Sequence, residues 1–171
     1  PTRGDVLVFG ASVTREPAEV RRRVGLAPQQ ISLYPTFTAW ENLDFFGVLH
    51  AVPSSVRRRR ADELLDLVGL AGRRNDPVHV FSGGMQRRLE LAATLVHNPE
   101  LIVLDEPTAG LDPVLRAKFW GHFRQLRDDG RTIIATTQYV TESEYCDRIA
   151  VLKDGGLLTI GTPDEIRREA L

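Results

Sequence analysis

Two short stretches of the sequence carry residue types that can do chemistry. In the first, "SGGMQ", Ser82 precedes the adjacent glycines Gly83 and Gly84, directly ahead of apolar residues at helical spacing. A serine here can cap the first helical turn, which leaves backbone N–H groups and the positive end of the helix facing an anion. The turn therefore predicts a phosphate contact, although the sequence has no G-x-x-x-x-G-K-[ST] loop, the usual phosphate cradle.

The second stretch is the acid pair Asp105 and Glu106, which follows four branched apolar residues in "LIVLDEP". Taken alone, the pair could cap the helix that follows it. Beside a phosphate site, one carboxylate could instead hold Mg²⁺ through water while the other acts on an attacking water. The two residues by themselves leave both interpretations open.

Alternating strands and helices must position these two stretches. Strands are predicted from short apolar runs and helices from apolar residues three and four apart. The predicted strands cover 4–10, 101–107, 132–137 and 148–156, and the predicted helices cover 17–25, 40–50, 56–68, 85–96 and 114–130. Strands separated by helices form a mainly parallel sheet, whose ligands gather at the carboxyl ends of the strands. The fold class is therefore α/β, and the acid pair lies at the ligand-binding edge.

Composition excludes several classes of protein. The 171 residues carry a net charge of −1 and are 42% hydrophobic, which fits one ordinary core and gives no general attraction to nucleic acid. Cys146 is the only cysteine, so no intramolecular disulfide framework exists and a reducing compartment is favoured. The arginine runs at 21–23 and 57–60 lack interleaved aromatic residues and are interpreted as solvated faces.

The order of the motifs resembles a known family. "FSGGMQRRL" followed by "LIVLDEPTAGLD" resembles the signature motif, Walker B motif and D-loop of the ATP-binding-cassette (ABC) ATPases. The stretch 25–43 resembles the family's Q-loop and the start of its helical subdomain, and 134–166 resembles its switch region and C-terminal strands. The resemblance implies a P-loop NTPase core of the ABC type over 1–30 and 96–171, with a helical signature subdomain over about 31–95.

This resemblance implies a role for each matching residue. Glu106 would orient or deprotonate the hydrolytic water, and Gln138 would hydrogen-bond the γ-phosphate, so these two would be catalytic. Asp105 would hold Mg²⁺, and Gln29 would touch the metal or the water. The remaining residues would act across a dimer interface, toward ATP bound to the opposite subunit: Ser82, Gly83, Gly84, Gln86 and Asp112. The implied cofactors are ATP and Mg²⁺.

Two features depart from the family pattern. Family members carry a phosphate-cradling Walker A loop and a central strand upstream of the stretch that matches 4–10, and the sequence contains neither. We therefore expect a partial nucleotide-binding domain from a longer polypeptide, inactive as an isolated segment. Gln138 stands where the family usually has histidine, and its string "TTQY" resembles exporters of the daunorubicin-resistance type.

The leading hypothesis is the ATP-binding and hydrolysing subunit or domain of an ABC exporter of drugs, lipids or other hydrophobic compounds. Two such domains, identical or different, would sandwich ATP and drive a separate transmembrane permease from the cytoplasmic face of the cell membrane. Nucleic acid is not an expected partner. Two alternatives stay open: a soluble ABC ATPase of translation or DNA repair, and a truncated, non-catalytic ABC module.

Overall fold

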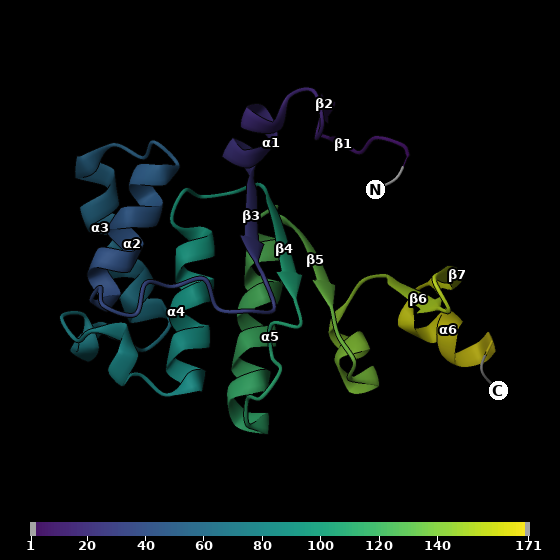
Figure 1. The fold of residues 1–171 in the computed structure, drawn as a ribbon. Coiled ribbons are helices and arrows are strands. Elements are labelled where there is room, and N and C mark those ends of the chain that lie inside the picture. The colour runs from purple at the N-terminus through teal and green to yellow at the C-terminus, as the bar shows by residue number, and fades with distance from the viewer. Residues whose placement is uncertain (1–2, 170–171) are drawn as a thin grey trace.

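A parallel sheet of order β3-β4-β5 lies at the centre of the computed structural model, which describes residues 3–169 (Figure 1). Its strands are β3 (Val24–Ala27), β4 (Leu101–Asp105) and β5 (Thr132–Thr136). Both pairings are parallel, so the carboxyl ends of all three strands meet at one edge of the sheet. The predicted mainly parallel α/β fold is confirmed.

Strand β4 is the buried centre of this sheet. Ile102 and Leu104 are each 1% exposed, and Leu101 is also buried. This burial confirms the strand that the continuous apolar run predicts. The following helix α5 (Pro113–Asp128) buries Phe119, Trp120 and Phe123 in the same core.

Three helices form the helical side of the molecule, at the left of Figure 1: α2 (Ala39–Leu49), α3 (Ser54–Leu67) and α4 (Gly83–Leu95). Helix α2 begins with a capping box between Thr38 and Glu41. Two short 3-10 turns, Ala71–Arg73 and Val78–Val80, lead from α3 to α4. The apolar stripes of the three helices meet in one core, where Leu43, Leu65 and Leu89 are at most 1% exposed.

The predicted helix over 17–25 is two residues too long. Helix α1 (Pro17–Arg23) ends earlier because Val24 already belongs to β3 and pairs with Leu101. Gly25 does not end the helix; it lets α4 approach the sheet. A Cβ atom on Gly25 would lie 2.6 Å from the carbonyl oxygen of Thr94, which no larger residue could tolerate.

The apolar stretch at 4–10 forms a hairpin outside the parallel sheet. Strands β1 (Leu7–Val8) and β2 (Ala11–Ser12) pair antiparallel. Between them, Phe9 and Gly10 have φ values of 50° and 85°, as a two-residue hairpin turn requires.

The C-terminal part forms a second, separate hairpin at the right of Figure 1. A 3-10 turn (Val140–Tyr145) leads to β6 (Ile149–Lys153), β7 (Gly156–Gly161) and α6 (Pro163–Glu169). The predicted strand at 148–156 therefore ends sooner, at a turn formed by Asp154 and Gly155, both with positive φ. Within residues 3–169, β5 pairs only with β4, β6 pairs only with β7, and no helix is long and apolar enough to cross a membrane.

Candidate functional site

The carboxyl edge of the sheet brings three distant segments together at Glu106. Gln29, two residues after β3, donates its Nε2–H to Oε2 of Glu106 at 3.2 Å. Gln138, two residues after β5, donates its Nε2–H to Oε1 at 2.6 Å. Two neutral amides therefore hold both oxygens of one carboxylate, because parallel strands end side by side.

Asp105, the last residue of β4, is held by Thr136. The Thr136 hydroxyl donates to Oδ1 of Asp105 at 2.5 Å and accepts the backbone N–H of Glu106 at 3.0 Å. Sequence reasoning missed Thr136, since only the strand register, in which Asp105 lies beside Thr136, shows its importance. One hydroxyl thus orients the side chain of one acid and the backbone of the other.

The acid pair has the donor set that Mg²⁺ prefers. Among residues 3–169, Oδ2 of Asp105 has no hydrogen-bond partner, and neither carboxylate contacts a cationic side chain. The described part of the chain also holds no cluster of three or more His, Cys, Asp or Glu residues that could bind a metal. Mg²⁺ needs no such cluster, because it is usually held by one or two carboxylates together with waters and substrate phosphates.

Glu106 adopts a backbone conformation that is uncommon for its residue type. Its φ of 46° lies in the left-handed region, which non-glycine residues enter at a cost in free energy. The turn is held from both sides, by Thr136 at the N–H group and by Arg87 Nη2, which donates to the Glu106 carbonyl at 3.0 Å. Such a conformation persists because the surrounding contacts fix it.

The glycine turn leaves an open end on α4. The Ser82 hydroxyl accepts the N–H of Met85 at 3.3 Å, which confirms the predicted cap. A Cβ on Gly83 would meet nothing within 4 Å, and one on Gly84 would meet only two leucine methyl groups at 3.8 Å. Neither residue has a positive φ, so internal packing does not explain the two glycines. The side-chain amide of Gln86 points back and donates to the Phe81 carbonyl at 3.1 Å.

Asp112 caps α5 and lies apart from the acid pair. Its Oδ1 accepts the N–H of Leu115 at 2.9 Å, and its side chain is exposed. Leu115 also provides one of the methyl groups near Gly84, so the start of α5 adjoins the glycine turn. Within residues 3–169, no hydrogen bond joins Ser82 or Asp112 to either carboxylate. The predicted site residues therefore form two groups. The first lies at the sheet edge and is called the acid cluster: Gln29, Asp105, Glu106 and Gln138. The second is the exposed face of the glycine turn.

A second residue that sequence reasoning missed is Glu142, which is 1% exposed. Its carboxylate accepts from the Thr108 hydroxyl at 2.5 Å and from the Thr137 hydroxyl, and it lies 3.4 Å from Arg116. Thr108 follows the acid pair and Thr137 precedes Gln138. Glu142 therefore ties together the two turns that flank the site.

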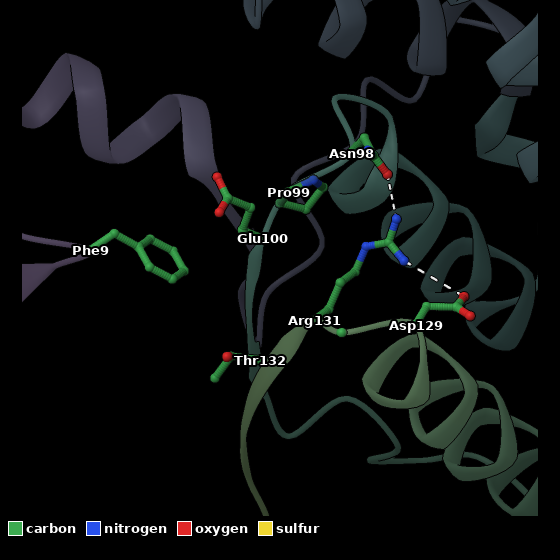
Figure 2. Close-up of a pocket in the computed structure, with 8 residues that line it drawn as sticks. Phe9, Asn98, Pro99, Glu100, Asp129, Arg131 and Thr132 are labelled. Atoms are coloured by element: carbon green, nitrogen blue, oxygen red, sulfur yellow. Dashed lines mark hydrogen bonds and ion pairs between the residues drawn. The ribbon is translucent and has the colours of Figure 1, made fainter.

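A pocket of about 240 Å³ lies at the opposite edge, by the amino ends of β4 and β5 (Figure 2). Arg131 extends across it, donates to Oδ1 of Asn98 at 2.5 Å and lies 3.8 Å from Asp129. Glu100 beside it is bound by Arg23 at 2.7 and 2.8 Å. None of the predicted site residues lines this pocket, so the acid cluster is the candidate site.

Comparisons with known proteins show the family of the chain. The family model described as "ABC transporter" matches residues 1–109. The chain is 41% identical over 164 residues to the linearmycin resistance ATP-binding protein of Bacillus subtilis (strain 168), covering 95% of this chain and 53% of that protein. It is 43% identical over 168 residues to the daunorubicin/doxorubicin resistance ATP-binding protein of Streptomyces peucetius, covering 98% and 51%.

A solved dimeric ATP-binding cassette, in a post-hydrolysis state with ADP and Pi, superposes on this structure with a TM-score of 0.87 at 30% identity. The match covers 95% of this chain and 75% of that one. The chain spans about half the length of the curated relatives it matches.

Proposed function

The chain belongs to the ABC transporter family, and on that premise we propose that its acid cluster hydrolyses ATP to power export through a membrane permease. One observation carries the proposal: Glu106, at the carboxyl end of the central strand, is held by the amides of Gln29 and Gln138. Relatives named for resistance to linearmycin and daunorubicin support drugs or similar hydrophobic compounds as the exported class.

In the proposed reaction, Glu106 orients and activates the attacking water, since its carboxylate is an acceptor fixed between two neutral donors. Asp105 would hold Mg²⁺ through its open Oδ2, and the amide oxygen of Gln29 would face the metal or the water. When bound, Mg²⁺ neutralises charge on the transferred phosphate. Gln138 has a second N–H, which would donate to the γ-phosphate while the first stays on Glu106.

The exposed glycine turn is proposed to face a second nucleotide-binding domain. Its open backbone at the positive end of α4 supports contact with the γ-phosphate of ATP held by that partner. The residues assigned to this contact are Ser82, Gly83, Gly84, Gln86 and Asp112, and the dimeric state of the solved neighbour supports it. In this proposal, 31–95 form the helical subdomain, 1–30 and 96–171 form the core, and the permease holds the protein at the cytoplasmic face of the membrane.

The test is steady-state ATP hydrolysis by the full-length protein, purified with its permease, with and without Mg²⁺. We expect turnover that depends on Mg²⁺, and no turnover from the isolated 171-residue segment, which contains no phosphate-cradling loop. Nucleotide binding by the full-length protein without hydrolysis would contradict the proposal and favour a non-catalytic ABC module.

A further inference from the structure

Helix α4 carries two buried charged side chains that contact the loops of the acid cluster. Arg87 is 5% exposed and Glu90 is 2% exposed, and they lie three residues apart on the same helix. Charged side chains are rarely buried this completely without compensating partners. The partners of Arg87 and Glu90 therefore identify the segments that α4 fixes in position.

Arg87 binds four backbone carbonyls in two loops. Its Nη1 donates to the Pro28 carbonyl at 2.6 Å, beside Gln29. On the other loop, Nη2 donates to the carbonyls of Asp105 and Glu106 at 2.7 and 3.0 Å, and Nε donates to that of Pro107 at 3.1 Å. The planar guanidinium fork suits such convergent acceptors, which one ammonium group could not reach together.

Three of these carbonyls are consecutive and belong to the turn in which Glu106 has a φ of 46°. A left-handed residue that is not glycine requires outside contacts to stay in place. Arg87 supplies such contacts on the carbonyl side, since it binds the residue itself and both of its neighbours. The position of the Glu106 side chain therefore depends on this guanidinium.

Glu90 holds the other end of the Gln29 loop. Its Oε2 accepts the Ser32 N–H at 2.9 Å, and its Oε1 accepts the Ser32 hydroxyl at 2.6 Å. Because Arg87 binds Pro28, the segment 28–32 is fastened to α4 at both ends, with Gln29 between the two attachments. Gln29 in turn donates to Glu106.

The pKa of Arg87 also depends on the carboxylates of the site. Burial lowers the pKa of Arg87, and the nearby carboxylates of Glu90, Asp105 and Glu106 oppose this effect. The guanidinium contacts the backbone carbonyls and leaves the carboxylate oxygens of the acid pair available.

We propose that Arg87 and Glu90 are positioning residues for ATP hydrolysis, which fix Gln29 and Glu106 relative to α4. The proposal rests on the proposed function. It gives α4 a second role: the helix that begins at the glycine turn also sets the geometry of the water-activating carboxylate, so nucleotide contact at that turn is linked to both catalytic loops.

The first test measures Glu90→Gln in the full-length protein with its permease, alone and combined with Gln29→Ala. The glutamine amide is neutral, and its NH₂ can meet the Ser32 hydroxyl only if that hydroxyl turns round to accept, so both charge-assisted hydrogen bonds to Ser32 are lost. Alone, we expect kcat to fall about 10-fold, with KM for ATP changed less than about 3-fold. In the Gln29→Ala background the further fall should be under about 2-fold, because the positioned residue is gone. The same factor in both backgrounds would indicate a general structural defect and overturn the proposal.

The second test compares Arg87→Lys with Arg57→Lys. Arg57 is a matched control, since it pairs with Asp44 at 2.7 Å and donates to the Val52 carbonyl at 3.0 Å, away from both loops. We expect kcat to fall at least about 10-fold for Arg87→Lys and less than about 2-fold for Arg57→Lys. Parental turnover in Arg87→Lys would overturn the proposal. Failure of both Arg87→Lys and Glu90→Gln to fold, while the control folds, would overturn it too, by assigning the pair to the fold alone.

Amide hydrogen exchange of the same proteins separates this inference from the proposed function. We expect faster exchange in 28–32 for Glu90→Gln, in both 28–32 and 105–108 for Arg87→Lys, and in neither segment for Arg57→Lys. If the parent hydrolyses ATP but the variants exchange at the parental rate in these segments, the positioning contacts are contradicted and the proposed function stands. A parent without ATPase activity would contradict the proposed function and the catalytic role of the pair, and the exchange pattern would then decide whether α4 holds the two loops.

Discussion

The two edges of the parallel sheet carry similar acids in opposite surroundings. At the amino edge, Glu100 accepts two hydrogen bonds from Arg23, at 2.7 and 2.8 Å. At the carboxyl edge, only neutral amides and a hydroxyl contact the carboxylates of Asp105 and Glu106 among residues 3–169. Glu100 therefore has its own cationic partner, whereas Asp105 and Glu106 stay available to a cation from outside.

A hollow of the surface and the acid cluster lie at opposite edges of the sheet. The hollow at the amino edge, about 240 Å³, contains Arg131, whose guanidinium is bound by Asn98 and lies close to Asp129 (Figure 2). The acid cluster differs from this hollow, because its carboxylates have no cationic partner among residues 3–169. The candidate site is therefore chosen on carboxylates without a cationic partner and not on the hollow.

The largest expected effect distinguishes two glutamates, one from each edge. Glu106→Gln keeps the side-chain shape but removes the basic carboxylate, so turnover should fall about 10²-fold or more while ATP binding persists. Glu100→Gln should leave turnover within about 2-fold, because a half-exposed ion pair contributes little. The measurements are steady-state hydrolysis and nucleotide binding by the full-length protein. Parental turnover in Glu106→Gln would show that this residue only caps the turn.

Variants of Gln138 test whether the candidate site supports ATP hydrolysis with glutamine in place of the family's usual histidine. If it supplies a neutral hydrogen bond to the γ-phosphate, Gln138→His should change turnover little, and Gln138→Ala should cost about 1 to 3 kcal/mol of transition-state stabilisation. Steady-state ATPase activity of the parent and both variants, each with its permease, is the measurement. Equal rates for the parent and the alanine variant, with a sharp gain for the histidine variant, would indicate a degenerate switch.

The two ends of β5 allow a finer comparison between threonines. Thr136→Val removes the hydroxyl that orients Asp105, so the Mg²⁺ concentration for half-maximal activity should rise about 10-fold. Thr132→Val makes the same change at the amino end of the same strand and should leave that concentration unchanged. A magnesium titration of ATPase activity separates the two variants. Identical titrations would remove Thr136 from the site.

The smallest expected effect concerns stability at the amino edge. His97 stacks on His50 with ring centroids 3.7 Å apart, and burial together with this neighbour lowers its pKa from 6.5 to about 4. As pH falls, His97 therefore takes up its proton in the unfolded chain before it does so in the folded protein. The stability that neutral, buried His97 contributes is complete above pH 6.5 and is lost as pH falls toward 4. Between these values, the thermal midpoint should fall by a few degrees more in the parent than in His97→Gln. Equal pH dependence of the thermal midpoint in the parent and in His97→Gln would contradict the lowered pKa of His97. ATP turnover at neutral pH should be the same in both proteins.

Local patterns predicted most of the fold and the position of the acid pair. Strand β4 and the helices follow from apolar periodicity, and the position of Asp105 and Glu106 follows from their place at the end of a buried strand. The meeting of Gln29 with Glu106 required the family resemblance, since 77 residues separate them. The roles of the glycine turn and Asp112 remain predictions.

Most of the contacts that sequence reasoning missed join distant segments. The sequence pattern assigned no role to Arg87, yet its side chain reaches Pro28, 59 residues away. Glu90 reaches Ser32 across 58 residues, and Thr136 meets Asp105 only through the register of two strands. A polar residue inside an apolar helical stripe gives no local sign of its partner, because that partner depends on packing between elements.

The most direct test of the difference between the two edges is to locate the metal. Mn²⁺ can replace Mg²⁺ at sites built from carboxylates and waters, and its anomalous scattering reveals its position in a crystal. For the full-length protein crystallised with Mn²⁺ and a non-hydrolysable ATP analogue, we predict an anomalous peak in direct or single-water contact with Asp105, beside Glu106. A nucleotide-associated peak at Glu100 or Asp129, with none at Asp105, would contradict the account.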